Sequence, residues 1–193
     1  MKAQLYLESS ALIDWQTPTV SALAAELASS LSDPEEVARR CFEWVRDKIA
    51  HSGDIQADVM TRSASDVLRE KTGWCFAKSH LLAALLRANG IPAGLCYQRL
   101  LRDDGKGLSL HGLNGVLLPG VGWYRVDARG NKPGVNAQFT PPREQLAWPI
   151  VEPGEADFPG VWHEPLPIIV SYLQRSNSLA EAIKNMPDIV TFR

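Results

Sequence analysis

The sequence contains few cysteines, no long apolar run and almost no net charge. Its 193 residues include three cysteines, and so small and odd a number argues against a disulfide framework. No apolar run is long enough to span a membrane, and the first residues lack the apolar core of a signal peptide. A net charge of −2 argues against a general nucleic-acid binder, which normally carries a basic face. We therefore predict a cytoplasmic protein that binds neither membranes nor nucleic acids.

Metal-binding motifs are also missing. The sequence has no CxxC pair, no HExxH and no Asp-rich calcium loop, so we predict neither a metal site nor a cofactor. It does contain enough apolar residues for one core, because 45% of them are hydrophobic and 22% are charged. Its length fits one domain better than two.

Apolar residues at helical spacing predict helices in the first half of the chain. One helix is expected over residues 18–31, and a second over 33–49, where Asp33 can cap the first turn and Pro34 suits the first helical position. A short helix is expected near residues 63–68. The third long helix should begin at or beside Cys75 and end at Asn89-Gly90. We expect this last helix to be mostly buried, since its apolar face is wide.

After Pro92 the apolar pattern changes to alternation, which is typical of strands. Strands are expected over residues 95–100, 111–118 and 123–127, and the short turns between them favour an antiparallel meander. Most of the 13 prolines fall between residues 131 and 167, which predicts an irregular arm. A capping box at Ser178 predicts a short final helix.

Cys75 stands in Thr72-Gly73-Trp74-Cys75, directly ahead of the buried helix. A helix N-terminus offers free N–H groups and partial positive charge, which favour a thiolate and can stabilise the oxyanion of a tetrahedral intermediate. Gly73 would let the backbone approach a substrate, and Trp74 would form a wall of the acyl pocket. Taken alone, Cys75 is equally well explained as a structural thiol, and Trp74 as a core residue.

A cysteine nucleophile needs a base and a group that orients the base. His111 begins one expected strand and Asp127 ends the next. Counting back from a turn near Pro119-Gly120, His111 faces about residue 128, and a one-residue shift or bulge would bring Asp127 beside it. An Asp bound to one ring nitrogen would leave the other free for the thiol. Each residue alone is better explained as a polar strand end or a turn former.

Together these residues resemble the core signature of the transglutaminase-like superfamily, in particular its bacterial cysteine proteases and acyltransferases. The resemblance covers about residues 36–130 and rests on three pieces: the Gly-x-Cys at 73–75, Leu-Leu-Arg-Ala-Asn-Gly-Ile-Pro-Ala at 85–93, and Trp-Tyr-Arg-Val-Asp at 123–127. It implies an α+β, papain-like fold in which N-terminal helices pack on an antiparallel β-sheet. The nucleophile would lie at the N-terminus of a buried helix. We expect one domain over residues 1–193, with a core at about 18–130 and the arm and C-terminal helices at 131–193.

The resemblance also implies a catalytic triad of Cys75, His111 and Asp127 that works through a thioester. We expect hydrolysis of a peptide or protein amide, with acyl transfer to an amine as the alternative. Two other possibilities are a non-catalytic binding module on the same fold and a metal site built from the same three side chains. His51 follows the second helix at a place where similar proteins often carry an aromatic residue, so it joins Trp74 and Gly73 as a candidate for oxyanion or substrate binding. A surface loop histidine is the simpler interpretation of His51.

Overall fold

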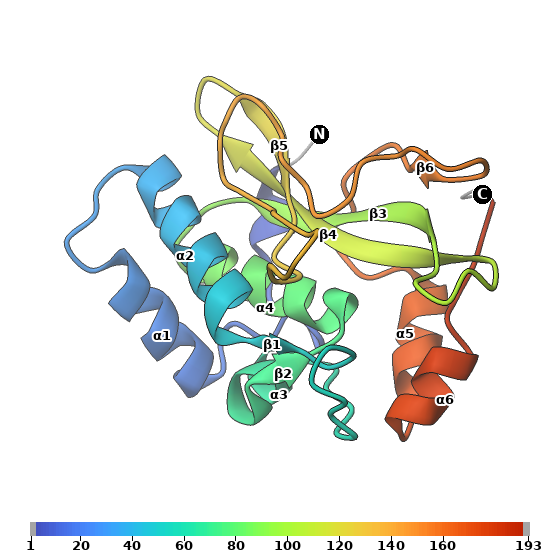
Figure 1. The fold of residues 1–193 in the computed structure, drawn as a ribbon. Helices are drawn as coiled ribbons and strands as arrows, with labels where there is room; N and C mark the ends of the chain where they lie inside the picture. Colours follow the sequence, from blue (N-terminus) through green and yellow to red (C-terminus); the bar gives the residue numbers. More distant parts are fainter. Residues whose placement is uncertain (1–2, 191–193) are drawn as a thin grey trace.

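A computed structural model describes residues 3–190 of the chain (Figure 1). Helices dominate the first half, and a four-stranded antiparallel sheet follows. The expected α+β arrangement is therefore confirmed. In chain order the elements are η1 (Ala3–Leu7), α1 (Pro18–Ala28), α2 (Pro34–Lys48), β1 (Ala50–His51), α3 (Ala64–Glu70), β2 (Thr72–Gly73), α4 (Cys75–Ala88), β3 (Ala93–Leu101), β4 (Leu108–Leu118), β5 (Gly122–Val126), β6 (Ala156–Asp157), α5 (Pro167–Arg175) and α6 (Leu179–Lys184).

The helices begin where the sequence supplies caps. Asp33 accepts a hydrogen bond from the backbone N–H of Glu35 at 3.0 Å, and Pro34 occupies the first position of α2. Ser63 and Asp66 form a reciprocal capping box at the start of α3. These two helices begin as expected, because a cap is a local feature that depends on a few neighbouring residues.

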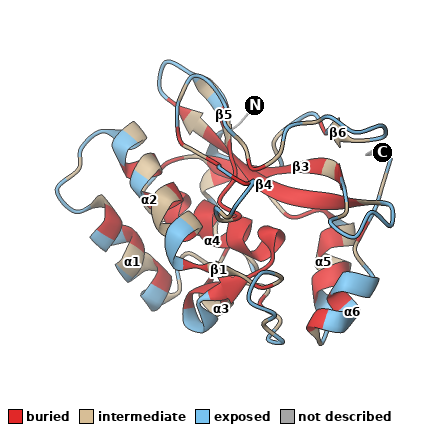
Figure 2. Ribbon diagram, viewed as in Figure 1, coloured by how far each residue is buried: buried red, intermediate tan, exposed pale blue. Residues whose placement is uncertain are grey.

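Helix α4 is the centre of the interior. All its residues from the first to Arg87 are buried, and Figure 2 shows it as a red ribbon between the sheet and the other helices. It packs against β3 and β4 on one side and against α1, α2 and α3 on the others. Gly112 of β4 permits this approach, since a Cβ there would lie 2.6 Å from the ring of Phe76. The helix axis is thus held close to the sheet.

The sheet has the strand order β5-β4-β3-β6. Strand β3 pairs with β4 along its whole length, from Ala93 opposite Val116 to Leu101 opposite Leu108. Strand β5 is shorter and pairs only with residues 114–118 of β4. Among the described strands, none continues beside residues 108–113 on that side. The N-terminal half of β4 therefore has one open edge, and this edge faces the site described below.

The proline-rich arm crosses the face of the sheet opposite α4. A Cβ at Gly94 or Gly115 would contact Val161 of the arm, whereas the neighbouring Asn114 side chain donates to the carbonyl of Ser79 in α4. The arm is mostly irregular, as expected, and adds the short strand β6 to the sheet edge. Helix α5 (Pro167–Arg175) was not anticipated at this position.

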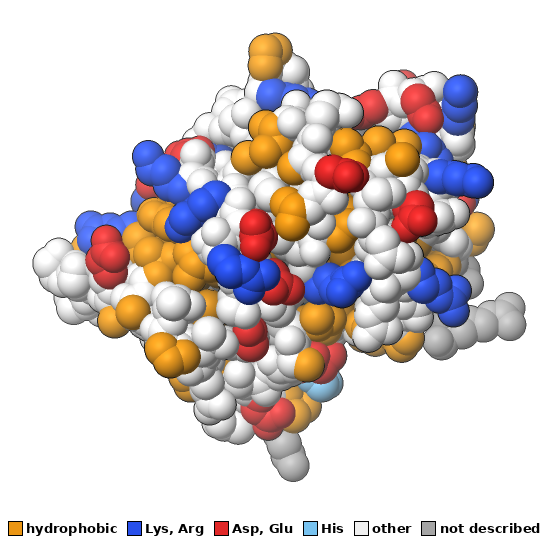
Figure 3. Space-filling view, turned by 90° about the horizontal axis from the view of Figure 1, so that it is seen from below, with side chains coloured by type: hydrophobic (Ala, Val, Ile, Leu, Met, Phe, Trp, Pro, Cys, Tyr) orange, Lys and Arg blue, Asp and Glu red, His pale blue; other side chains and the backbone are white. Residues whose placement is uncertain are grey.

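The outer surface carries charges of both signs. On the face seen in Figure 3, acidic and basic side chains are intermixed, in keeping with the net charge of −2. Over residues 3–190, no helix combines the length and apolar character needed to cross a membrane.

Candidate active site

Cys75 is the first residue of α4, and its side chain is buried at the edge of a cleft. Its Sγ accepts the backbone N–H of Gly112 at 3.4 Å. This N–H lies on the open edge of β4, beyond the end of β5. The sulfur thus sits where a neighbouring strand would otherwise continue.

The short parallel pair β1 and β2 sets the entry into α4. His51 pairs with Gly73 in this ladder, and Trp74 follows with extended backbone before the helix begins. Gly73 itself does not line the cleft. A Cβ at this position would lie 3.1 Å from the Thr61 hydroxyl and 3.2 Å from Val67, so the close approach that Gly73 permits is to α3 and its preceding loop.

His111 and Asp127 are hydrogen-bonded through Nε2 and Oδ2 at 2.7 Å. Asn114 pairs with Val126, the last residue of β5, and the same register continued would set Asp127 opposite Leu113. His111 lies two residues along on the same face, so the two side chains are diagonal neighbours. Counting along the sequence from the turn near Pro119-Gly120 placed residue 128 opposite His111. The observed register differs from that count and brings the Asp127 side chain into contact with His111 without a bulge.

The buried carboxylate of Asp127 is surrounded by hydrogen-bond donors. Besides His111, its carboxylate accepts the backbone N–H of Arg129 at 3.0 Å and that of Ala147, in the arm, at 3.3 Å. Burial raises the pKa of Asp127, but the charge and hydrogen bond of His111 and the two N–H groups outweigh it, and its pKa is lowered. Asp127 is therefore held as a carboxylate.

His111 is held as an imidazolium by its two neighbours. Burial alone would lower its pKa, yet the charges of Asp127 and Cys75 and hydrogen bonds to both side chains raise it to about 10. The structure thus brings together all three residues of the predicted triad. The arrangement is of the kind in which a thiolate can share the proton of an adjacent imidazole.

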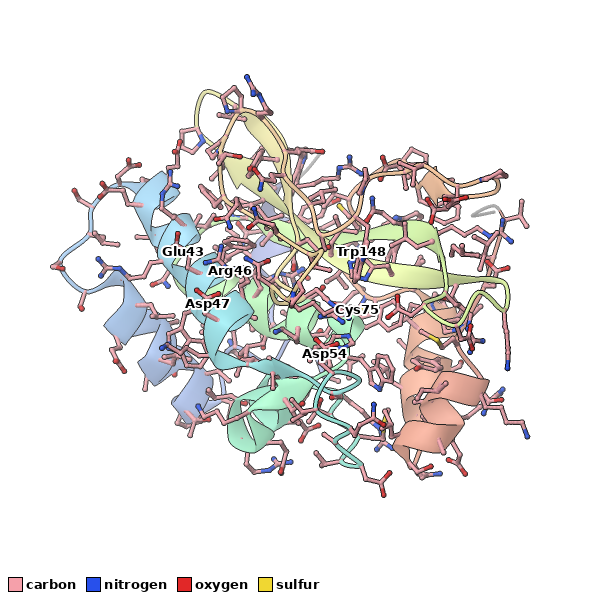
Figure 4. All side chains as sticks on the ribbon, viewed as in Figure 1. Glu43, Arg46, Asp47, Asp54, Cys75 and Trp148 are labelled. Carbon is pink, nitrogen blue, oxygen red and sulfur yellow. The ribbon has the colours of Figure 1, made fainter. Side chains whose placement is uncertain are left out.

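Cys75 and His111 line a cleft of about 320 Å³, whereas Asp127 is buried behind His111. Figure 4 shows Cys75 between Trp148 of the arm and Asp54 of the loop after β1, and both of these residues line the cleft. His51 and Trp74 line it too, with their ring centroids 5.2 Å apart in an edge-to-face contact.

His51 and Trp74 each present a buried polar nitrogen beside the cleft. Neither His51 Nδ1 nor Trp74 Nε1 has a hydrogen-bond partner within residues 3–190. Burial, followed by the positive charge of Arg129, lowers the pKa of His51 well below its ordinary value, so its ring is neutral. Buried polar groups normally have partners, so two unpartnered nitrogens on residues that line the cleft with Cys75 are suited to a ligand oxygen.

Trp148 is a site residue that the sequence pattern did not reveal. Its ring lies edge-on to that of His111, with centroids 4.9 Å apart, and the Arg129 guanidinium lies 5.3 Å from its centroid. The backbone N–H of the preceding Ala147 is the one that binds Asp127. Nothing in the irregular arm pointed to these contacts, apart from an aromatic residue among prolines.

A second unanticipated group joins the two sides of the cleft. Arg129 Nη2 donates to Asp54 Oδ1 at 2.6 Å, and Lys132 Nζ donates to the same oxygen at 3.1 Å. Burial raises the pKa of Asp54, but its bonds to Arg129 and Lys132 outweigh this and lower it to about 2. The pair connects the loop after His51 with the segment after Asp127.

Lys78 is the third such residue, and it is completely buried one turn after Cys75. Its ammonium donates to the carbonyl of Ile49, just before β1. Burial, and then the charge of Arg129, lower its pKa to about 7, although nearby carboxylates oppose the shift. A single lysine in an apolar helix is easily assigned to the surface, so the sequence around Lys78 did not indicate that it is buried.

Within residues 3–190, no cluster of three or more His, Cys, Asp or Glu side chains could hold a metal ion. The donor set at Cys75 therefore gives no support to the metal-site alternative.

Comparison with known proteins gives one family and several similar folds. The family described as the transglutaminase-like superfamily matches residues 21–128. A candidate cysteine protease from Cytophaga hutchinsonii superposes with a TM-score of 0.55 at 20% identity, over 67% of this chain and 43% of its own. The periplasmic domain of TgpA from Pseudomonas aeruginosa gives 0.49 at 22% identity, over 66% and 48%. The chain thus spans less than half of either structure. No relative was found among curated proteins.

Proposed function

Since the chain belongs to the transglutaminase-like superfamily, we propose that it is a cysteine-dependent hydrolase of peptide or protein amide bonds, with Cys75, His111 and Asp127 as its triad. The observation that carries the proposal is the 2.7 Å bond between a buried Asp127 and His111, which lines the same cleft as Cys75. A structural thiol needs no such neighbours.

In the proposed reaction, the Cys75 thiolate attacks the carbonyl carbon of the amide, and the carbonyl electron pair moves onto oxygen. His111 then gives its proton to the amide nitrogen as the C–N bond breaks, which leaves a thioester and a free amine. The neutral ring next takes a proton from water while the water oxygen attacks the thioester. Collapse of this second intermediate releases the acid and the thiolate, and His111 is again protonated.

Asp127 holds the ring of His111 in one orientation and stabilises its charge. We assign oxyanion stabilisation to the backbone N–H at the start of α4 together with the indole N–H of Trp74 and the ring of His51. This assignment is supported by the two unpartnered nitrogens, which belong to residues that line the cleft together with Cys75. A neutral His51 can donate one N–H without adding a second positive charge to the site.

The first test is selective alkylation. Burial raises the pKa of both Cys41 and Cys96 to about 12, and neither lines the cleft. Iodoacetamide at neutral pH should therefore label Cys75 at least about tenfold faster than the other two thiols, because the thiolate is the reactive form. Peptide mapping by mass spectrometry measures the three rates in one sample.

The second test is capture of the thioester. The protein is mixed with a defined set of peptide amides and quenched in acid, and its intact mass is recorded. A covalent adduct on Cys75 that decays with release of free acid is the expected result. Transfer of the acyl group to added glycine amide in preference to water would make the protein an acyltransferase. Equal labelling of the three thiols, together with no covalent adduct on Cys75, would favour a non-catalytic binding module.

A further inference from the structure

The chain's own tail segment, defined here as residues 186–188, lies on the open edge of β4 beside Cys75. The backbone N–H of Leu110 donates to the carbonyl of Pro187 at 2.7 Å. Two residues further, the N–H of Gly112 binds the Cys75 sulfur. Alternate N–H groups of a strand point to the same side, so Pro187 takes the place of a neighbouring strand directly beside the nucleophile.

Polar contacts hold the tail segment in this place. Asp188 forms a two-pronged ion pair with Arg99, with Nε to Oδ1 at 2.6 Å and Nη2 to Oδ2 at 2.7 Å. Arg99 lies on β3 opposite Leu110, so the ion pair and the backbone bond act at the same level of the sheet. Arg102 also donates to the carbonyl of Ile183, in α6, at 3.1 Å.

The cleft next to the tail segment has an apolar wall that is open to solvent. Leu101, Val151 and Ile183 line it, and they are 42%, 71% and 37% exposed. Met186 of the tail segment lines the same cleft as Cys75 and His111. Exposed apolar side chains gathered at one cleft indicate a binding surface.

We propose that the open edge of β4, residues 108–112, binds an extended peptide by strand addition, with an apolar side chain against the wall formed by Leu101 and Val151. In the resting protein the tail segment occupies this edge, with Met186 as the apolar side chain and Pro187 as the paired residue. Main-chain bonds to Leu110 would supply affinity, and the apolar wall would supply specificity. For the reaction itself this inference rests on the function proposed above, whereas peptide binding can be measured without turnover.

The test uses full-length protein with Cys75→Ala, so no result depends on catalysis. The probe is a fluorescein-labelled peptide with the sequence of residues 182–190, Ala-Ile-Lys-Asn-Met-Pro-Asp-Ile-Val. Asp188→Lys places two positive charges together at Arg99 and releases the tail segment. We expect its apparent affinity for the probe, measured by fluorescence anisotropy, to rise about 3- to 10-fold because the edge is vacant more often.

Two controls define the site of binding. Glu26→Lys makes the same change of charge on the exposed surface of α1 and should leave probe affinity unchanged. A probe with Glu in place of Met should bind the Asp188→Lys variant at least about fivefold more weakly, since the wall is apolar. The milder Asp188→Asn replaces Asp188→Lys if circular dichroism shows that the latter is unfolded.

Hydrogen exchange at the Leu110 amide gives the independent readout. Exchange should accelerate in Asp188→Lys and slow again when the probe is added. Equal probe affinity with and without the release of the tail segment, or no change at Leu110 on binding, would overturn the proposal. If the probe binds as expected while wild-type protein forms no thioester, the proposed function fails and the peptide-binding edge stands. If wild-type protein forms the thioester while the probe does not bind as expected, the peptide-binding edge fails and the proposed function stands.

Discussion

The two sides of the cleft are built in different ways. The Cys75 side is regular: α4 is buried on every side, and its first residue carries the sulfur. The Trp148 side is irregular, and single contacts hold it, such as the Ala147 N–H to Asp127 and the ring of Trp148 against His111. Regular packing thus fixes the Cys75 sulfur, whereas individual bonds from the arm fix the His111–Asp127 pair. Variants on each side should therefore fail differently.

The largest effect is expected on the regular side, from Cys75→Ala. The methyl group fits the space of the thiol, so the fold should persist while amide hydrolysis falls about 10⁴-fold or more. Turnover of whichever peptide forms the thioester measures this loss. Cys96→Ala is the matched control, a buried thiol elsewhere whose loss should leave kcat/KM unchanged. Residual thiol-independent hydrolysis at the wild-type rate would remove Cys75 from the mechanism.

Asp127→Asn tests the junction of the two sides and should lower kcat about 10³- to 10⁴-fold. It also removes the strongest source of the raised pKa of His111, which lies at about 10 in the wild type. His111 then loses its proton at lower pH than in the wild type. The alkaline limb of the pH–rate profile should therefore shift to lower pH. A slower variant with an unshifted limb would mean that Asp127 acts on something other than the charge of His111.

Trp148→Ala tests the irregular side alone. Without the edge contact, the His111 ring gains freedom, and misplacement of a catalytic group commonly costs about 10- to 100-fold. We expect a fall of this size in kcat with a small change in KM, and substantial recovery in Trp148→Phe. Trp123→Ala removes a half-exposed tryptophan from β5, away from the cleft, and serves as the comparison. Equal losses from both tryptophans would indicate a general effect on stability.

The smallest effect concerns how stability changes with pH, and Lys78→Met should reveal it. The folded pKa of His111, about 10, is above its ordinary 6.5, so its contribution to stability is complete below pH 6.5 and disappears as pH rises through 10. The folded pKa of Lys78, about 7, is below its ordinary 10.5, so its cost is complete below pH 7 and disappears as pH rises to 10.5. The two trends oppose each other in the wild type.

Removing the buried amine leaves only the trend of His111. The free energy of unfolding of Lys78→Met should therefore fall more steeply between pH 7 and 10 than that of the wild type. Urea titrations at several pH values measure both slopes. A parallel pair of curves would show that Lys78 does not change its protonation on unfolding in this range.

The same division between regular and irregular regions explains what the sequence could predict. The N-terminal cap of α2 follows from a few neighbouring residues, and the burial of α4 and the β3–β4–β5 meander follow from local periodicity; all three are present. Strand β6 lies within the proline-rich stretch and helix α5 begins at its end, and because this stretch has no periodicity neither was located. The family match also ends at residue 128, whereas Trp148 and Met186, which line the cleft, lie beyond it.

The sequence pointed to three residues that the structure brings together, although their catalytic role stays a prediction, and it did not reveal the contacts that support them. Cys75, His111 and Asp127 follow one another along the chain, and the expected pairing of consecutive strands predicted that His111 and Asp127 lie close together. The burial of Lys78 was not visible, because only the folded chain shows that the carbonyl of Ile49 is its partner. The pair of Arg129 and Asp54 joins residues 75 positions apart, and no local pattern links them. The extent of the domain, with its core at about 18–130, stays a prediction.

Gly112 connects folding and chemistry in one residue. A methyl group at this position would push against Phe76 in the first turn of α4. The sulfur and the imidazole come from the two elements that such a methyl group would separate. The packing of the core and the geometry of the proposed triad therefore depend on the same close approach, and a larger residue at position 112 would disturb both together.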